Sequence, residues 1–327
     1  MNSVSLPRIV LGVSSCLLGQ PVRYDGAARR DGYIVDTLAR HVEFVPICPE
    51  VESGMGVPRP PVQLMGDPAH PRMLGVLDQR ADFTAGMQRF GATVGPRIEH
   101  ISGYIFKSRS PSCGVWDTPI LAADGPVRAY SAGLFARAVV RHRPHLPVQD
   151  ERTLHTPQAR DQFFEQVFSY RRWQQHVAPA PTLAALREFH VAHKYSLLAH
   201  DAERYRALGR MLATATLSPA LVAGYAAQFF TALRKPATRA THVNVLQHLA
   251  GYFKKSATLD ERRDLRKLIA SYHGGATELD TVLHVVRALT ANYPNAYLRK
   301  QHYLYPEEDE ALLRSSAGPS HSSASAL

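Results

Sequence analysis

Cysteine is scarce in this chain of 327 residues: Cys16, Cys48 and Cys113 are the only three. They form no CxxC pair, because 31 and then 64 residues separate them. The first residues lack the basic segment and the long apolar core of a secretory signal. An odd number of cysteines without an export signal argues against a disulfide framework. We therefore expect a cytoplasmic protein with reduced thiols.

Long apolar runs are also missing, although the apolar share of 45 % is ordinary for a globular protein. No run approaches the roughly 18 residues that a membrane helix needs, so the sequence predicts no membrane partner. The length is sufficient for two domains, each with its own core.

Acidic residues are in the minority, which gives a net charge of +10. A basic balance suits a polyanionic partner, nucleic acid first, although many basic proteins bind none. The excess leans toward the C-terminal part, with +4 in residues 1–176 and +6 in residues 177–327.

Each cysteine follows or ends a short run rich in Val, Ile and Phe: IVLGVSSC, EFVPICPE and GYIFKSRSPSCG. Such runs predict buried strands, and the carboxyl ends of parallel strands share one ligand-binding edge of a sheet. We therefore expect the three thiolates to meet at one metal centre. Thiolates are soft ligands that suit iron–sulfur clusters, zinc or copper(I). The alternative is that each cysteine is a small buried apolar residue.

The periodicity predicts strands at 7–15, 42–48 and 101–106, alternating with helices at 32–41, 81–100 and 131–142. This order favours a Rossmann-like α/β layered domain with a mainly parallel sheet. The stretch from Pro49 to Arg72 is so rich in Pro and Gly that we expect neither helix nor central strand there, but a functional loop.

The pattern changes after an amphipathic helix at 161–176 and a linker at 178–182. Helical periodicity then dominates, at 183–199, 201–216, 219–234, 240–256, 260–273 and 278–292. We expect a first domain at 1–176, an all-α second domain at 177–314 and a disordered tail at 315–327.

Three motifs, GVSSCLLGQPVRYDG, PICPEVESGMGVPRPPVQL and FKSRSPSCG, resemble the thiouracil desulfidase (TudS) family over most of residues 8–145. The resemblance implies a [4Fe-4S] cluster held by Cys16, Cys48 and Cys113, with one iron left open. In such a site the open iron binds the sulfur of a thionated base, water attacks the C=S carbon, and the sulfur leaves as sulfide.

The same motifs supply candidate site residues. Glu50 is the preferred base for activating water, with Glu52 and Asp25 as weaker alternatives. Ser110 and Ser112, both just before Cys113, are catalytic candidates or residues that shape the turn. The resemblance implies an essential serine before the third cysteine, and its position favours Ser110. Substrate or cluster contacts are expected from Ser14, Arg23, Asp25, Arg59 and Arg109.

The segment REFHVAHKYSLLAHDAERYRALGRMLA resembles a YbgA-type helical domain, over roughly residues 180–305. Its polar residues recur mostly at three- and four-residue steps, which predicts a common helix face. We expect RNA contacts from His190, His193, Lys194, Arg204, Tyr205 and Arg210. A solvated or packed helix face, or a zinc site at the two histidines, are the alternatives.

The fused architecture resembles RudS-type proteins, which remove sulfur from 4-thiouridine in tRNA. The sequence therefore predicts a tRNA 4-thiouridine desulfidase with tRNA as its partner. One alternative is the same chemistry on free thiouracils or thionucleotides. Another is a non-enzymatic RNA-binding protein with a structural or redox-sensing metal centre, and a third is zinc on the three cysteines plus a histidine.

Overall fold

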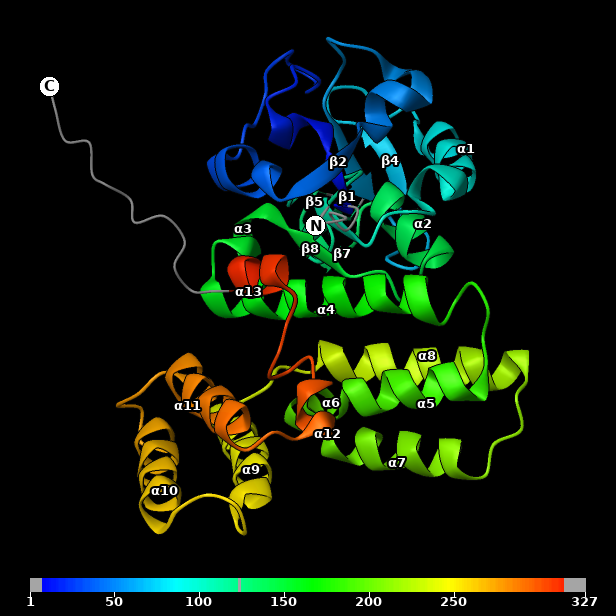
Figure 1. Ribbon diagram of the computed structural model, residues 1–327. Coiled ribbons are helices and arrows are strands. Elements are labelled where there is room, and N and C mark those ends of the chain that lie inside the picture. Colours follow the sequence, from blue (N-terminus) through cyan, green and yellow to red (C-terminus); the bar gives the residue numbers. More distant parts are fainter. Residues whose placement is uncertain (1–7, 123–124, 315–327) are drawn as a thin grey trace, which may run out of the picture. The chain divides into compact units, whose positions relative to one another are not determined.

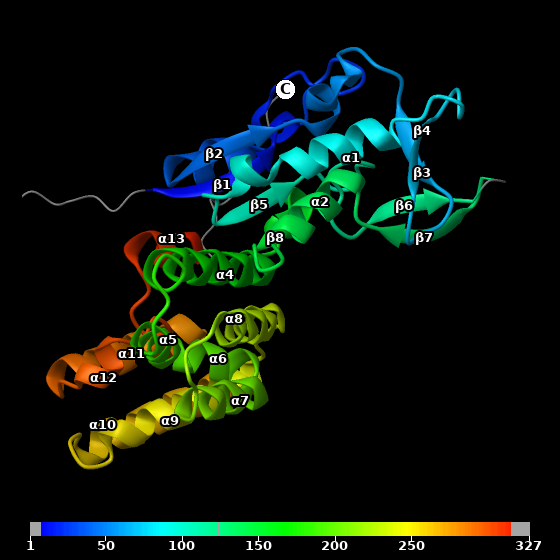
Figure 2. The same cartoon turned by 90° about the vertical axis from the view of Figure 1, so that its right-hand side faces the viewer.

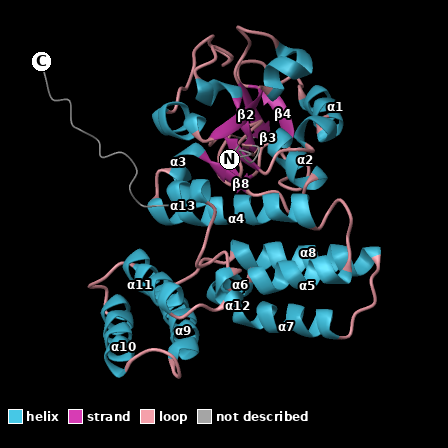
Figure 3. Cartoon of the chain, viewed as in Figure 1, coloured by secondary structure: helices cyan, strands magenta, loops and turns pink. Residues whose placement is uncertain are grey.

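The computed structural model describes residues 8–122 and 125–314 and divides the chain into two compact units (Figure 1). Unit 1 holds the chain up to Arg171 and again from Leu313, and unit 2 runs from Arg172 to Leu312. The domain boundary at residue 176 stays a prediction, and the tail expected to be disordered, 315–327, lies outside the described residues. Among the described residues, strands occur only in unit 1 (Figure 3).

Unit 1 contains a four-stranded sheet made of β1 (Ile9–Ser14), β2 (Val42–Ile47), β5 (Gly103–Phe106) and β8 (Val148–Asp150). The strand order is β2-β1-β5-β8, and all three pairings are parallel. This confirms the predicted α/β class with a mainly parallel sheet. Because every pairing is parallel, the four carboxyl ends lie at one edge.

Helices cover both faces of this sheet. The helical segments of unit 1 are η1 (Ser15–Leu18), η2 (Tyr33–Thr37), η3 (Leu38–Arg40), η4 (Val51–Met55), α1 (Thr84–Thr93), η5 (Gly95–Ile98), α2 (Leu134–His142), α3 (Glu151–Leu154), most of α4 (Pro157–His176) and the end of α13 (Glu308–Arg314).

Side chains of β5 alternate between the two faces, as the pleat requires. Ile105 joins the apolar core that Phe164 and Val167 of α4 fill. The rings of Tyr104 and Phe106 turn the other way and contact Phe135 of α2, with ring centroids 6.1 and 6.2 Å from it. The sheet is thus the middle of three layers, with α4 on one side and α2 on the other (Figure 2).

A second sheet combines β3 (Val62–Met65), β4 (Arg72–Gly75), β6 (Thr118–Leu121) and β7 (Val127–Ser131) in the order β4-β3-β6-β7. The expectation that 49–72 holds no helix and no central strand is wrong, because β3 pairs on both sides and η4 is helical. The prolines at 58, 60 and 61 stop just before Val62. The four residues of β3 therefore keep the backbone N–H groups that a central strand needs.

Among its described residues, unit 2 holds helices and connecting loops but no strand, and it includes the end of α4 and the start of α13. Its other segments are α5 (Leu183–Ala192), α6 (Lys194–His200), α7 (Ala202–Ala213), α8 (Pro219–Arg234), α9 (Arg239–Ala250), η6 (Gly251–Phe253), α10 (Leu259–His273), α11 (Leu279–Asn292) and α12 (Ala296–Arg299). The predicted helix at 183–199 is interrupted at His193, where α5 ends and α6 begins. In the described part of the chain, no helix combines the length and apolar character needed to cross a bilayer.

Candidate active site

A cavity of about 550 Å³ lies at the carboxyl edge of the parallel sheet. Each of the four strands leads directly or by a short loop into its lining. Cys16 follows β1, Cys48 follows β2, Cys113 lies in the loop after β5, and Glu151 follows β8. The structure thus brings the three cysteines together by the strand-end geometry from which their meeting was expected.

None of the three thiols forms a disulfide; Cys113 is buried, and Cys16 and Cys48 are half-buried. Burial, together with the nearby Cys48 sulfur, raises the pKa of Cys16 to about 11. Burial also raises the pKa of Cys48, and it raises that of Cys113 well above its ordinary value, with Cys16 and Cys48 adding to the effect. Negative charge on a neighbouring thiol thus adds to the effect of burial on the pKa of Cys16 and of Cys113.

Glu50 lies on the wall of this cavity with both carboxylate oxygens engaged. The Ser112 hydroxyl donates to Oε1 at 2.6 Å, and the Arg59 guanidinium donates to Oε2 at 2.8 Å from Nε and 2.5 Å from a terminal nitrogen. Arg59 is almost fully buried and also donates 2.8 Å hydrogen bonds to the carbonyls of Val22 and Gly56. Its charge is therefore committed to positioning Glu50.

Ser110 organises the turn that carries Cys113. Its hydroxyl accepts hydrogen bonds from the backbone N–H groups of Ser112 at 3.3 Å and Cys113 at 3.1 Å. Its carbonyl accepts from the N–H of Gly114 at 2.8 Å and from the Thr118 hydroxyl at 3.0 Å. The two candidate serines thus differ: Ser112 contacts the candidate base, and Ser110 contacts the backbone of a cysteine loop.

Ser14 connects β1 to the loop after β5. Its hydroxyl accepts a 3.0 Å hydrogen bond from the backbone N–H of Lys107. It also interacts with the Cys113 thiol, where it opposes the effect of burial on the pKa. Ser14 lines the cavity and supports the position of a cysteine, and its contact with substrate stays a prediction.

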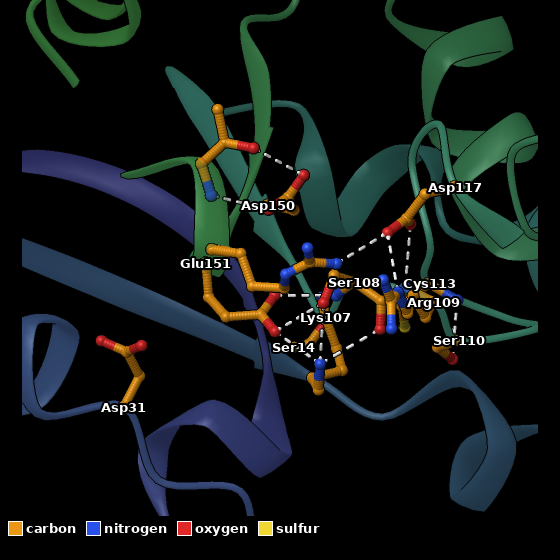
Figure 4. A network of polar contacts seen from close by, with 12 residues as sticks. Ser14, Asp31, Lys107, Ser108, Arg109, Ser110, Cys113, Asp117, Asp150 and Glu151 are labelled. Carbon is orange, nitrogen blue, oxygen red and sulfur yellow. Dashed lines mark hydrogen bonds and ion pairs between the residues drawn. The ribbon is translucent and has the colours of Figure 1, made fainter. Parts of the chain in front are cut away.

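Sequence reasoning missed a buried ionic group formed by Lys107, Ser108 and Glu151 (Figure 4). The Lys107 ammonium pairs with Oε1 of Glu151, and the Ser108 N–H donates to Oε2 at 2.7 Å. Lys107 and Glu151 line the cavity. The only sequence signal for Glu151 is that it directly follows the strand at Val148–Asp150, and three residues give too short a pattern to recognise.

The remaining predicted residues lie nearer the rim. Arg23 and Arg109 line the cavity and pair with Asp25 at 3.4 Å and Asp117 at 3.6 Å. Asp25 itself is exposed and does not line the cavity among the described residues. Glu52 pairs with Arg97 and accepts from the backbone N–H of Cys48 at 3.1 Å, so it supports the loop of a cysteine.

The donor set fits a thiolate-bound cluster better than a single zinc ion. Of the described residues, no group of three or more His, Cys, Asp or Glu is arranged to hold one metal ion, and no histidine lines the cavity. A cluster has several irons, and its thiolates bind different irons, so the ligands need not surround one point. Three cysteines that line one cavity satisfy that requirement.

The residues predicted to contact RNA lie on α5, α6 and α7 of unit 2. His190 stacks on Tyr205 at 5.3 Å, and burial, aided by Lys194, lowers the pKa of His190 to about 4, so its ring is neutral at pH 7. The ammonium of Lys194 lies 5.1 Å from the centre of the Tyr195 ring.

The other three occupy different environments. His193 is buried, and its Nδ1 lies 2.8 Å from the carbonyl of Phe189, so its ring packs in the interior of unit 2. Arg204 pairs with Asp201 at 2.8 Å, at the residue that caps α7. Arg210 is exposed in the last turn of α7.

The chain thus consists of a layered α/β unit with cysteines at its sheet edge and a helical unit. Two family models match it, one in each part. Residues 11–151 match 2-thiouracil desulfurase, and residues 194–307 match a protein of unknown function, DUF1722. The uncharacterized protein YbgA of Escherichia coli (strain K12) is 34 % identical over 125 residues, which are 37 % of this chain and 74 % of that protein. This chain belongs to the same family as YbgA.

Among solved structures, the [4Fe-4S]-dependent thiouracil desulfidase TudS is similar in sequence at 29 % identity. The similarity covers 46 % of this chain and 94 % of that one, with a TM-score of 0.36.

Proposed function

We propose that this protein is a [4Fe-4S]-dependent desulfidase that converts 4-thiouridine in tRNA to uridine and sulfide. The single observation that carries the proposal is the meeting of three cysteine thiols and the Glu50 carboxylate on one cavity. The match of residues 11–151 to 2-thiouracil desulfurase supports the reaction class.

Cys16, Cys48 and Cys113 would hold the cluster. Bound by only three protein thiolates, it would supply an iron with an open position, a soft Lewis acid suited to the sulfur of a thiocarbonyl. Lys107 and the cationic residues of the rim, Arg23, Arg29 and Arg109, would balance the negative charge that thiolates and cluster bring into the cavity.

Glu50 would act as the general base. Its Oε1, held by Ser112, can accept a second hydrogen bond from a water molecule and take its proton. The water oxygen forms the new C–O bond, the C–S bond breaks, and the sulfur leaves as hydrogen sulfide or its anion. The change is hydrolytic, so atoms and electrons balance without an added reductant.

The preference for tRNA rests on unit 2 and on charge. A free thionated base needs no second domain, whereas a base within folded RNA must be gripped and turned out of its stack. Phosphate contacts from a basic surface offset that cost of a few kcal/mol. Unit 2 comprises residues 172–312, and this part of the chain carries most of the excess of positive over negative charge.

A second candidate substrate is a free thiouracil, favoured by the description of the family that residues 11–151 match. A cavity of about 550 Å³ is within the range that encloses a small molecule, so the base alone can enter it. The chemistry and the roles of Glu50 and the cysteines are the same for both substrates.

Anaerobic reconstitution with iron and sulfide, followed by loss of the 4-thiouridine absorbance of bulk tRNA, tests the proposal. Free 4-thiouracil is assayed in parallel, and sulfide release is measured in both. Loss from tRNA with little turnover of the free base supports the tRNA assignment, and the reverse supports the second candidate.

Two variants test the cluster ligands and the general base separately. Cys48→Ala should fail to retain the iron–sulfur absorbance and activity, whereas Glu50→Ala should retain the absorbance and lose activity. If the reconstituted wild-type protein releases no sulfide from either substrate, it is not a desulfidase, and a structural or redox-sensing centre becomes the better interpretation.

A further inference from the structure

Helices α9 and α10 of unit 2, with the turn between them, line an open cavity of about 440 Å³ that none of the proposed chemistry uses. From α10 it takes residues at three- and four-residue steps, which form one helix face. The lining comprises Val243, Gln247, Ala250, Gly251, Lys254, Arg262, Leu265, Arg266, Ile269, Ala270 and His273.

The lining has two chemical parts. Val243, Leu265 and Ile269 supply an aliphatic surface, and Leu265 and Ile269 belong to the core of unit 2. Lys254, Arg262 and Arg266 supply three positive charges. A ligand that satisfies both parts has an apolar body and an anionic group.

No carboxylate lines the cavity among the described residues. The acidic residues of α10 are engaged elsewhere: Arg263 pairs with Asp260 at 2.8 Å and with Asp264 at 3.7 Å, and Glu261 caps the start of the helix. Within the described chain, Lys254, Arg262 and Arg266 form no ion pair. Their charges are therefore available to a ligand.

Arg262 is also held in place before any ligand arrives. It donates to the carbonyl of Lys254 at 2.7 Å and to the carbonyl of Thr258 at 3.3 Å, which fixes the guanidinium beside the cavity. A fixed guanidinium loses less side-chain entropy on binding an anion than a free one, and it can present two donors to a phosphate.

We propose that the α9–α10 cavity binds a nucleotide, with the base on the aliphatic surface and the phosphate between Arg262, Arg266 and Lys254. Gln247 and His273 add hydrogen-bonding groups to the lining, which can pair with the polar edge of a base but gain nothing from a simple hydrocarbon anion. The amide of Gln247 offers both donor and acceptor, as the edge of a base requires. The proposal does not depend on desulfidation.

Calorimetric titration of the full chain with uridine 5′-monophosphate tests it. Arg266→Glu should weaken binding by at least about ten-fold, because it reverses one of three charges around the phosphate. Lys267→Glu is the matched control, since it makes the same charge change on an exposed neighbour outside the lining. Ala270→Trp should abolish binding by filling the cavity, whereas Ala291→Trp, on the exposed side of α11, should not.

A competition experiment distinguishes a nucleotide within RNA from a free nucleotide as the ligand of the cavity. If a short single-stranded oligoribonucleotide displaces the nucleotide and Arg266→Glu weakens both, the cavity takes a nucleotide of RNA; if only the free nucleotide binds, it serves a small molecule. Absence of nucleotide binding, or equal weakening by Arg266→Glu and Lys267→Glu, overturns the proposal. Turnover of free 4-thiouracil by the same variants reports separately on the desulfidase.

Discussion

The hydroxyl of Ser112 donates a 2.6 Å hydrogen bond to Oε1 of Glu50, although 62 positions separate the two residues. The other oxygen of the carboxylate is held by the buried Arg59. A carboxylate fixed at both ends points in one direction, which a general base needs in order to meet its water. The loop after β2 and the loop after β5 therefore build the base together.

Glu50→Gln tests the base directly. Glutamine keeps the shape of the side chain but cannot take a proton, so we expect kcat to fall by about 10²–10⁴-fold with the iron–sulfur absorbance unchanged. Glu43→Gln, an exposed carboxylate on β2, is the control and should keep full activity. Should Glu52→Gln lose activity while Glu50→Gln keeps it, the assignment of the base is wrong.

Ser112→Ala and Ser110→Ala should differ in kind. The first removes a hydrogen bond to the base, so we expect kcat to fall about ten-fold or more and the pH–rate profile to shift, with cluster content intact. The second leaves two backbone N–H groups of the Cys113 turn without their acceptor, so we expect lower retention of iron. Iron content and the pH–rate profile, measured on both variants, distinguish these outcomes.

The parallel sheet and the meeting of the cysteines could be predicted from sequence because they depend on strand order. A buried run followed by a turn places the next residue at the sheet edge, and this rule covers Cys16 and Cys48 directly. It applies equally to Glu151, which was missed because β8 has only three residues and too short a pattern to recognise.

The partners of Glu50 could not be predicted in the same way. The sequence predicts that Arg59 contacts substrate or cluster, but it does not reveal that Arg59 also donates to the Glu50 carboxylate and to two loop carbonyls. Such contacts depend on how the 49–72 stretch folds. Because this stretch is rich in proline, the sequence pattern did not predict β3. The helices of unit 2 were easier to predict from the sequence, because an apolar period of three to four residues continues over many turns.

Lys107 and Glu151 should be energetically coupled, because the pair lies in poorly solvated surroundings. In a double-mutant cycle with Lys107→Met and Glu151→Gln, we expect a coupling above about 1 kcal/mol in the free energy of unfolding, measured by denaturant titration. The exposed pair of Asp78 and Arg80 is the matched control, with a coupling expected below about 1 kcal/mol. Equal couplings in both pairs would show that Glu151 is not held as the geometry indicates.

Gly114 follows Cys113 at a point where the chain has no space for a side chain. A Cβ there would lie 2.0 Å from Oγ1 of Thr118 and 3.0 Å from the carbonyl of Ser110. Gly114→Ala should therefore push the Cys113 turn out of place, lowering the free energy of unfolding by about 1–3 kcal/mol and reducing iron retention.

Gly224→Ala is the control, because a Cβ in that α8 position meets nothing within 4 Å. It should stabilise the protein by up to about 1 kcal/mol, as alanine does in a helix interior. Adding Thr118→Ala to Gly114→Ala removes the hydroxyl that the new methyl group meets, so iron retention should partly recover. If the double variant behaves no better than Gly114→Ala alone, steric contact with Thr118 is not the cause of the loss.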